Sequence, residues 1–147
     1  MKVLGVVGLP ASGKGTFSDV ALEMGIPVVV MGDVIRKAAE ERGLPMTDQS
    51  LGEIARTIRA EQGMDAIARL CIPAIEATGA PVVLVDGIRS DREVAVFRAY
   101  FPDFSLIGLS SSFEARLHRL TGRGRPDDTQ DPAALRSRDE RELSFGL

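Results

Sequence analysis

The feature that most constrains the fold is a glycine-spaced segment near the start of the chain. Residues 8–14 read GLPASGK, after an apolar run at residues 3–7 and before a stretch of helical composition that extends to about Met24. A G-x-x-x-x-G-K pattern between a strand and a helix is a P-loop, whose glycines let the backbone curl so that its amide groups converge on phosphate. The sequence therefore predicts a site for the phosphates of a nucleotide.

The same loop supplies the expected contacts to ATP and its metal ion. Lys14 is expected to reach the β- and γ-phosphates. Thr16 is the expected hydroxyl ligand of Mg²⁺, because Gly15 stands where the pattern usually has serine or threonine. A glycine-rich turn without a ligand is the alternative interpretation. The residues expected to bind ATP are Gly8, Pro10, Ala11, Ser12, Gly13, Lys14, Gly15 and Thr16.

Four short runs rich in β-branched residues predict strands, at residues 3–7, 28–31, 82–85 and 105–109. Continuous apolar runs without alternation are typical of strands buried on both faces of a parallel sheet. Segments with helical spacing separate the runs and are long enough for right-handed crossovers. These patterns predict an α/β fold of three layers, with a parallel sheet of four to five strands, in one domain that spans residues 1–147.

Helical patterns fill the connection between the second and third strands. A helix is expected at residues 33–43, and a longer helical stretch at residues 47–78 is expected to break at Gly63. This is more helix than a simple crossover needs. Residues from about 33 to 62 are therefore expected to form a helical insert that binds the acceptor.

Helix starts are also predicted after the third and fourth strands. The segments Ser90–Glu93 and Ser111–Glu114 both fit the capping-box pattern. Residues 122–132 have the composition of a loop. A last polar helix is expected from about Pro132 to Leu143.

Composition limits the partners and the compartment. The net charge is −3, and no apolar segment approaches the roughly 20 residues needed to cross a bilayer. Neither nucleic acid nor a membrane is therefore expected as a partner. Cys71 is the single cysteine of the chain, so an intramolecular disulfide is excluded, and Cys71 with His118 is too little for a zinc site. A cytoplasmic location is expected, with Cys71 as a small core residue.

Four motifs resemble those of the adenylate kinases. Gly13–Thr16 has the adenylate kinase form of the loop, and Met31–Arg36 is similar to T-G-D-x-[LI]-R, with Met31 in place of threonine. Asp86–Arg89 is similar to D-G-[FY]-P-R with one residue fewer, and Arg119–Arg125 is similar to the R-x-x-G-R that opens the lid. The chain resembles the nucleoside monophosphate kinases over essentially its whole length, and quite closely an archaeal group of adenylate-kinase-related P-loop proteins.

The resemblance implies transfer of the terminal phosphoryl group of ATP to a monophosphate such as AMP, with Mg²⁺ as cofactor. It implies that Lys14, Arg119 and Arg123 clamp the transferring group and that Thr16 and Asp86 hold the metal. A lid at about residues 119–138 is implied as well. The residues implied to bind the acceptor are Gly32, Asp33, Arg36, Gly87, Arg89 and Arg138.

Alternatives stay open at several positions. Asp86 follows a strand beside the loop, where a metal-binding carboxylate must lie, but a structural cap is the other interpretation. Glu93 either accepts hydrogen bonds from the acceptor base or completes its capping box. The charge run at residues 136–142 either returns from the lid or is a solvated helix face.

Two other functions fit the same motifs. One is a kinase for a hydroxyl acceptor, as in dephospho-coenzyme A kinase, with Asp33 as the base. The other is a nucleotide-binding regulator, or an ATPase without kinase turnover. Related kinases continue with a further strand and helix, which are expected to be missing here. The sequence therefore predicts an exposed strand edge or a homodimer that covers it.

Overall fold

Strands and helices alternate along the chain in the computed structural model, which describes residues 1–123 and 131–144. The predicted loop at residues 122–132 lies mostly outside the described residues. The elements are β1 (Lys2–Val7), α1 (Lys14–Glu23), β2 (Val28–Val30), α2 (Gly32–Glu41), α3 (Asp48–Gln62), α4 (Ala66–Ala77), β3 (Val82–Asp86), α5 (Asp91–Tyr100), β4 (Asp103–Gly108), α6 (Phe113–Arg123) and α7 (Pro132–Ser144).

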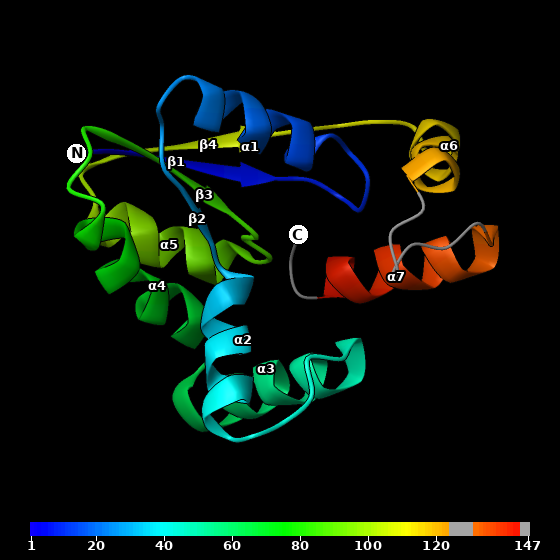
Figure 1. Ribbon diagram of the computed structural model, residues 1–147, viewed down its shortest axis with the longest axis horizontal. Helices are drawn as coiled ribbons and strands as arrows, with labels where there is room; N and C mark the ends of the chain where they lie inside the picture. Colours follow the sequence, from blue (N-terminus) through cyan, green and yellow to red (C-terminus); the bar gives the residue numbers. More distant parts are fainter. Residues whose placement is uncertain (124–130, 145–147) are drawn as a thin grey trace.

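The sheet has four parallel strands in the order β2-β3-β1-β4 (Figure 1). Its register pairs Val6 of β1 with Asp86 of β3, and Val7 of β1 with Gly108 of β4. The carboxyl ends of these strands therefore meet at one edge of the sheet, where the connection from β1 to α1 begins. The predicted parallel sheet is confirmed, and each predicted strand is present with its ends shifted by at most two residues.

Helices cover both faces of the sheet, because alternate strand residues point to opposite sides. Val3, Val83 and Val85 belong to a core shared with α4 and α5, whereas Val6 and Leu84 pack with Ala21 of α1 on the other face. Figure 1 shows α1 on one side of the strands and α4 and α5 on the other. The predicted three-layer architecture is thereby confirmed.

The helical segment between β2 and β3 divides as the sequence predicts. Thr47 caps α3 by accepting a hydrogen bond from the Ser50 amide at 3.2 Å. Gly63 ends α3 with φ 107°, a backbone angle that favours glycine. The segment α2 to α3 extends away from the sheet (Figure 1), and its role as an acceptor-binding insert stays a prediction.

The predicted cap of α5 by Ser90 is confirmed, whereas the second half of its capping box and the predicted cap of α6 differ from the structure. Ser90 accepts from the Glu93 amide at 3.3 Å, but the Glu93 carboxylate accepts from the amide of Arg89, one residue before the cap. The second prediction is wrong by one residue, because Ser112 and not Ser111 caps α6, accepting from the Ala115 amide at 3.1 Å. Ser111 is thereby left free to accept a hydrogen bond from Arg119.

Two further observations concern the core and the periphery. Cys71 is fully buried in the core, as predicted, and burial raises the pKa of its thiol to about 12. Among the described helices, none combines the length and the apolar character that a membrane span requires.

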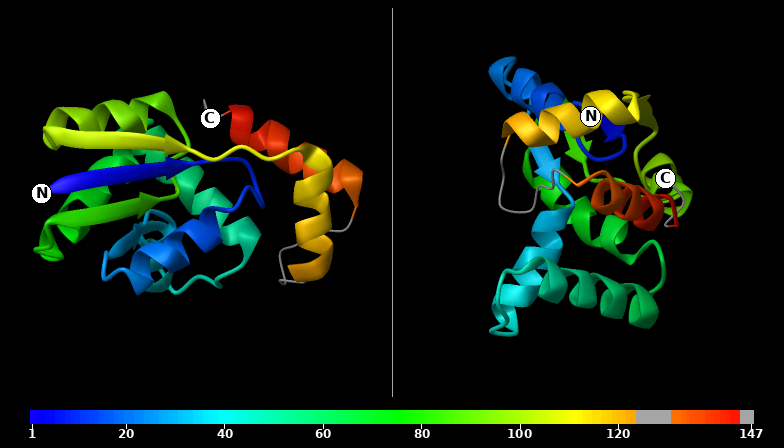
Figure 2. Two further views of the ribbon diagram at one scale, coloured as in Figure 1. Left: turned by 90° about the horizontal axis from the view of Figure 1, so that it is seen from above. Right: turned by 90° about the vertical axis from the view of Figure 1, so that its right-hand side faces the viewer.

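Beyond the carboxyl ends of β1 and β4, α6 and α7 form a separate layer (Figure 2). This layer faces the loop that follows β1.

Candidate functional site

The loop after β1 is a cradle of main-chain amides. Gly8 is required there, since a methyl group at this position would meet the Ser12 hydroxyl and lie 2.9 Å from the Leu109 carbonyl oxygen. Gly13 has φ 105° and turns the chain into α1. Within the described part of the chain, the amides of residues 13–16 donate to no carbonyl group. These amides, with the N-terminus of α1, form a site for an anion.

Lys14 lies within the same loop. Its ammonium group donates to the carbonyl oxygens of Gly8 at 2.5 Å and Leu9 at 3.2 Å. Burial lowers the pKa of Lys14, and the positive charge of Arg89 lowers it further. A phosphate bound in the loop would offer this ammonium group charged oxygens in place of neutral carbonyls, which is the stronger interaction.

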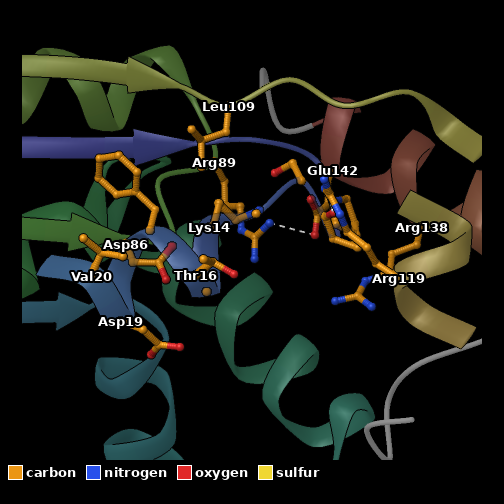
Figure 3. Close-up of a pocket in the computed structure, with 16 residues that line it drawn as sticks. Lys14, Thr16, Asp19, Val20, Asp86, Arg89, Leu109, Arg119, Arg138 and Glu142 are labelled. Atoms are coloured by element: carbon orange, nitrogen blue, oxygen red, sulfur yellow. Dashed lines mark hydrogen bonds and ion pairs between the residues drawn. The ribbon is translucent and has the colours of Figure 1, made fainter. Parts of the chain in front are cut away.

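A cavity of about 800 Å³ opens above the loop. Figure 3 shows the residues that border it, with Lys14 between Asp86 and Arg89 and with Arg119, Arg138 and Glu142 on the opposite side. Of the residues predicted to bind ATP, Gly8 is not among the lining residues, and the others line the cavity: Pro10, Ala11, Ser12, Gly13, Lys14, Gly15 and Thr16.

The two residues predicted to bind the metal lie at this cavity. Thr16 is exposed in the first turn of α1, and Asp86 ends β3. Asp86 accepts a long hydrogen bond, 3.5 Å, from the hydroxyl of Ser18, which is buried. Ser18 was not predicted as a site residue. Its spacing of four residues from Lys14 would have indicated it, since residues four apart share a helix face.

Two arginines of α6 contact the loop. Arg119 was predicted, and it donates to the Ala11 carbonyl oxygen at 2.8 Å and to the Ser111 hydroxyl at 2.9 Å. Arg116 was not predicted. Its guanidinium group is buried, donates to the Pro10 carbonyl oxygen at 3.3 Å, and forms a bidentate pair with Asp139 of α7 at 2.7 and 2.8 Å. The spacing of three residues places both arginines on one face of α6.

The side chain of Arg123, the third predicted clamp, lies outside the described residues. Arg138, which was predicted to bind the acceptor, lines the cavity above the loop instead. The charge run of α7 is not a uniformly solvated face, because Asp139 and Glu142 are buried whereas Glu140 is exposed.

A second cavity of about 500 Å³ lies between α2, α3 and α7. Gly32, Arg36 and Arg89, which were predicted to bind the acceptor, line it. Asp33 pairs with Arg36 at 2.6 Å on the exposed surface of α2 and is not among the lining residues. Gly87, with φ 104°, packs against Met31 and keeps the loop after β3 close to α2.

Among the described residues, the two cavities have Arg89 and Glu142 as common lining residues. These side chains form an ion pair at 2.7 Å, and Glu142 was not predicted as a site residue. No local motif marks Glu142, because its position depends on how α7 packs. The shared pair marks the place where ligands in the two cavities would meet.

Glu93 contacts the backbone of this pair, because its carboxylate accepts a hydrogen bond from the Arg89 amide at 2.8 Å. It is 1% exposed, and burial raises the pKa of its carboxyl group, while the hydrogen bond from the Arg89 amide opposes that shift. The residues that line the two described cavities do not include Glu93. This favours the capping role over recognition of an acceptor base.

Comparison with known proteins identifies the family of this chain. A family model described as AAA domain matches residues 7–134. A protein of Methanoculleus marisnigri named UPF0200 protein is 64% identical over 147 residues, which are all of this chain and 80% of that relative. A protein of the same name from Methanoregula boonei is 58% identical over 147 residues, covering all of this chain and 81% of that relative.

Two solved structures share the fold. TT1252 from Thermus thermophilus has a TM-score of 0.63 at 15% identity, with 97% of this chain and 82% of that one covered. A gluconokinase from Sinorhizobium meliloti has a TM-score of 0.50 at 17% identity, with 99% and 75% covered. At such identities the similarity concerns the fold alone, which is an α/β P-loop fold.

Proposed function

Because this chain belongs to the UPF0200 family and carries an AAA domain, we propose that it is an ATP-dependent phosphotransferase, which moves the γ-phosphoryl group of ATP to a nucleoside monophosphate such as AMP. The observation that carries the proposal is the junction of two cavities at Arg89, one above the phosphate loop and one bordered by Arg36. Transfer requires that the reacting groups of two substrates meet, and a junction of this kind allows it.

The donor half suits a nucleotide with a bound metal ion. The free amides of residues 13–16 and the ammonium group of Lys14 would hold the β- and γ-phosphates. Thr16 and Asp86 offer a hydroxyl and a carboxylate oxygen, which are the ligand types that Mg²⁺ prefers. Mg²⁺ in this place would neutralise charge on the phosphates during transfer.

The acceptor half suits a phosphate. In the proposed reaction the bond from the γ-phosphorus to the β–γ bridging oxygen breaks, and a bond to an oxygen of the acceptor phosphate forms. That oxygen is already ionised at neutral pH, so no strong base is needed. Lys14, Arg89 and Arg119 would stabilise the charge that spreads over the transferring group, and for this Arg119 would leave the Ala11 carbonyl oxygen.

A hydroxyl acceptor has less support. Its expected base, Asp33, is paired with Arg36 and is not among the residues that line the two described cavities. The resemblance of Met31–Arg36 and Asp86–Arg89 to the adenylate kinase motifs also supports a phosphate acceptor.

The proposal is tested by measuring ADP formation from ATP and Mg²⁺ across a panel of nucleoside monophosphates. We expect one or more of them to be consumed, with turnover at least about 100-fold slower in Lys14→Ala and unchanged in Lys37→Ala. Lys37 is a suitable control because it is exposed on α2 and lines neither described cavity. If calorimetry detects ATP binding but no monophosphate is consumed, the chain is a nucleotide-binding protein of another kind.

A further inference from the structure

Glu142 is a charged side chain that neither the loop nor the predicted acceptor motifs explain. It lies on α7, its side chain is 7% exposed, and one carboxylate oxygen pairs with Arg89 at 2.7 Å. The other oxygen, Oε2, is buried and has no hydrogen-bond partner among the described residues. A buried acceptor without a partner is costly to a folded protein, so this contact leaves part of the carboxylate unsatisfied.

The neighbouring acid on the same helix makes a useful comparison. Asp139 engages both of its oxygens with the buried guanidinium group of Arg116, which also donates to the Pro10 carbonyl oxygen. Asp139 thus attaches α7 to the phosphate loop without any help from Glu142. Because α7 has this separate anchor, the side chain of Glu142 can leave Arg89 while the helix stays in place.

The Glu142 carboxylate lies where an anion bound to Arg89 would lie. It borders both cavities together with Arg89, and Figure 3 shows it pointing to Arg89 beside Lys14. A carboxylate and a phosphate cannot both contact one guanidinium group closely without strong repulsion between them. A phosphate, with more oxygens, would also satisfy more of the donors around it than this carboxylate does.

We propose that Glu142 is an internal anion that occupies the place of the acceptor's phosphate on Arg89, so that an anion binds there only after Glu142 has left. Glu142 is then a specificity-determining residue. The cost of displacing it falls on every ligand that uses Arg89. A small anion such as inorganic phosphate has no further contacts to offset this cost, whereas a nucleotide also fills the cavity between α2 and α3. The identity of the acceptor rests on the proposed function, but the competition at Arg89 does not.

The test is isothermal calorimetry with inorganic phosphate and, separately, AMP, without ATP, at neutral pH and constant ionic strength. We expect Glu142→Gln to bind both probes more tightly than the unchanged protein, by a similar factor of roughly tenfold. The matched control is Glu140→Gln, which removes the same charge from an exposed position two residues earlier on α7. We expect it to change neither affinity.

Two further variants make the test decisive. Glu142→Asp withdraws the carboxylate by one methylene group and should give a smaller gain, while Arg89→Gln combined with Glu142→Gln should lose the gain. If Glu142→Gln lowers the thermal midpoint without tightening phosphate, Glu142 is only a structural partner of Arg89 and the inference is overturned. If phosphate gains affinity but AMP binds to no variant, the inference holds and the proposed acceptor is wrong.

Discussion

The two halves of the site are built in different ways. The proposed donor half is made mostly by the main chain of one short loop, with glycines that permit its shape and with amides at residues 13–16 that donate to no carbonyl group of the described residues. The proposed acceptor half is lined by residues of α2, α3, α7 and the loop after β3, and the pair Arg89–Glu142 lies where it meets the proposed donor half. The first half therefore depends on local backbone geometry, and the second on how α7 packs against the rest of the chain.

The largest effect should come from removing the buried ion pair between Arg116 and Asp139, which holds α7 against the loop. In Asp139→Ala the guanidinium group of Arg116 loses its partner in a buried position, so we expect the free energy of unfolding to fall by roughly 3–5 kcal/mol. Denaturant titration measures this. Glu140→Ala, at an exposed site on the same helix, should change it by less than about 0.5 kcal/mol.

Asp139→Ala also tests whether the two halves of the proposed site are independent of each other. If α7 is needed only for the acceptor half, protein that remains folded at low temperature should still bind ATP. Replacing Arg116 together with Asp139 by leucine should recover part of the lost stability, because it removes both buried charges. A loss of stability no greater than that of Glu140→Ala would show that α7 is not held by this pair.

The second effect concerns the main chain of the loop. In Gly8→Ala the added methyl group would meet Ser12 and the Leu109 carbonyl oxygen, so the loop must shift. We expect ATP affinity to fall by roughly 100-fold, since several amides would lose their alignment on the phosphates together. Calorimetry with ATP and Mg²⁺ measures it. Gly108→Ala is the matched control, because a methyl group there meets open space.

This contrast explains what could be predicted from the sequence. The loop, the strand that carries Asp86 and the four-stranded parallel sheet follow from patterns within short segments, and these predictions hold for the fold. Arg116, Asp139 and Glu142 were not predicted as site residues. Asp139 and Glu142 belong to a charge run on a helix, and such a run usually faces water. Their burial is decided by the packing of α6 and α7, which no local pattern encodes.

Arg138 and Ser111 illustrate the same limit on a smaller scale. The motif around Arg138 indicated the acceptor, but the turn of α7 directs this residue to the donor cavity. The capping pattern indicated Ser111, but α6 begins one residue later, and Ser111 contacts Arg119 instead. In both cases the sequence identified the segment, while the phase of the helix decided which side chain faces the site.

The third effect separates the two halves by their ligands. Of the two described cavities, Arg36 lines the one proposed to bind the acceptor. It is paired with the exposed Asp33, and such surface pairs contribute little to stability. We expect Arg36→Ala to raise the KM for the monophosphate by roughly tenfold and to leave ATP affinity and the thermal midpoint unchanged. Steady-state kinetics with each substrate varied in turn will measure this, with Arg42→Ala, exposed at the end of α2, as the control. An equal loss for ATP would mean that the halves are not separate.

The smallest effect should be that of Ser18→Ala, which tests whether side-chain packing also supports the proposed donor half. The hydroxyl of Ser18 donates to Asp86 over 3.5 Å, so its removal would loosen the carboxylate without changing the amides of the loop. We expect the Mg²⁺ concentration that gives half-maximal turnover to rise roughly two- to threefold, with kcat at saturating Mg²⁺ retained. Ser137→Ala, exposed on α7, should leave the Mg²⁺ dependence unchanged. A fall in kcat that added Mg²⁺ does not restore would instead mean that Ser18 supports the loop itself, and that the donor half too depends on side-chain packing.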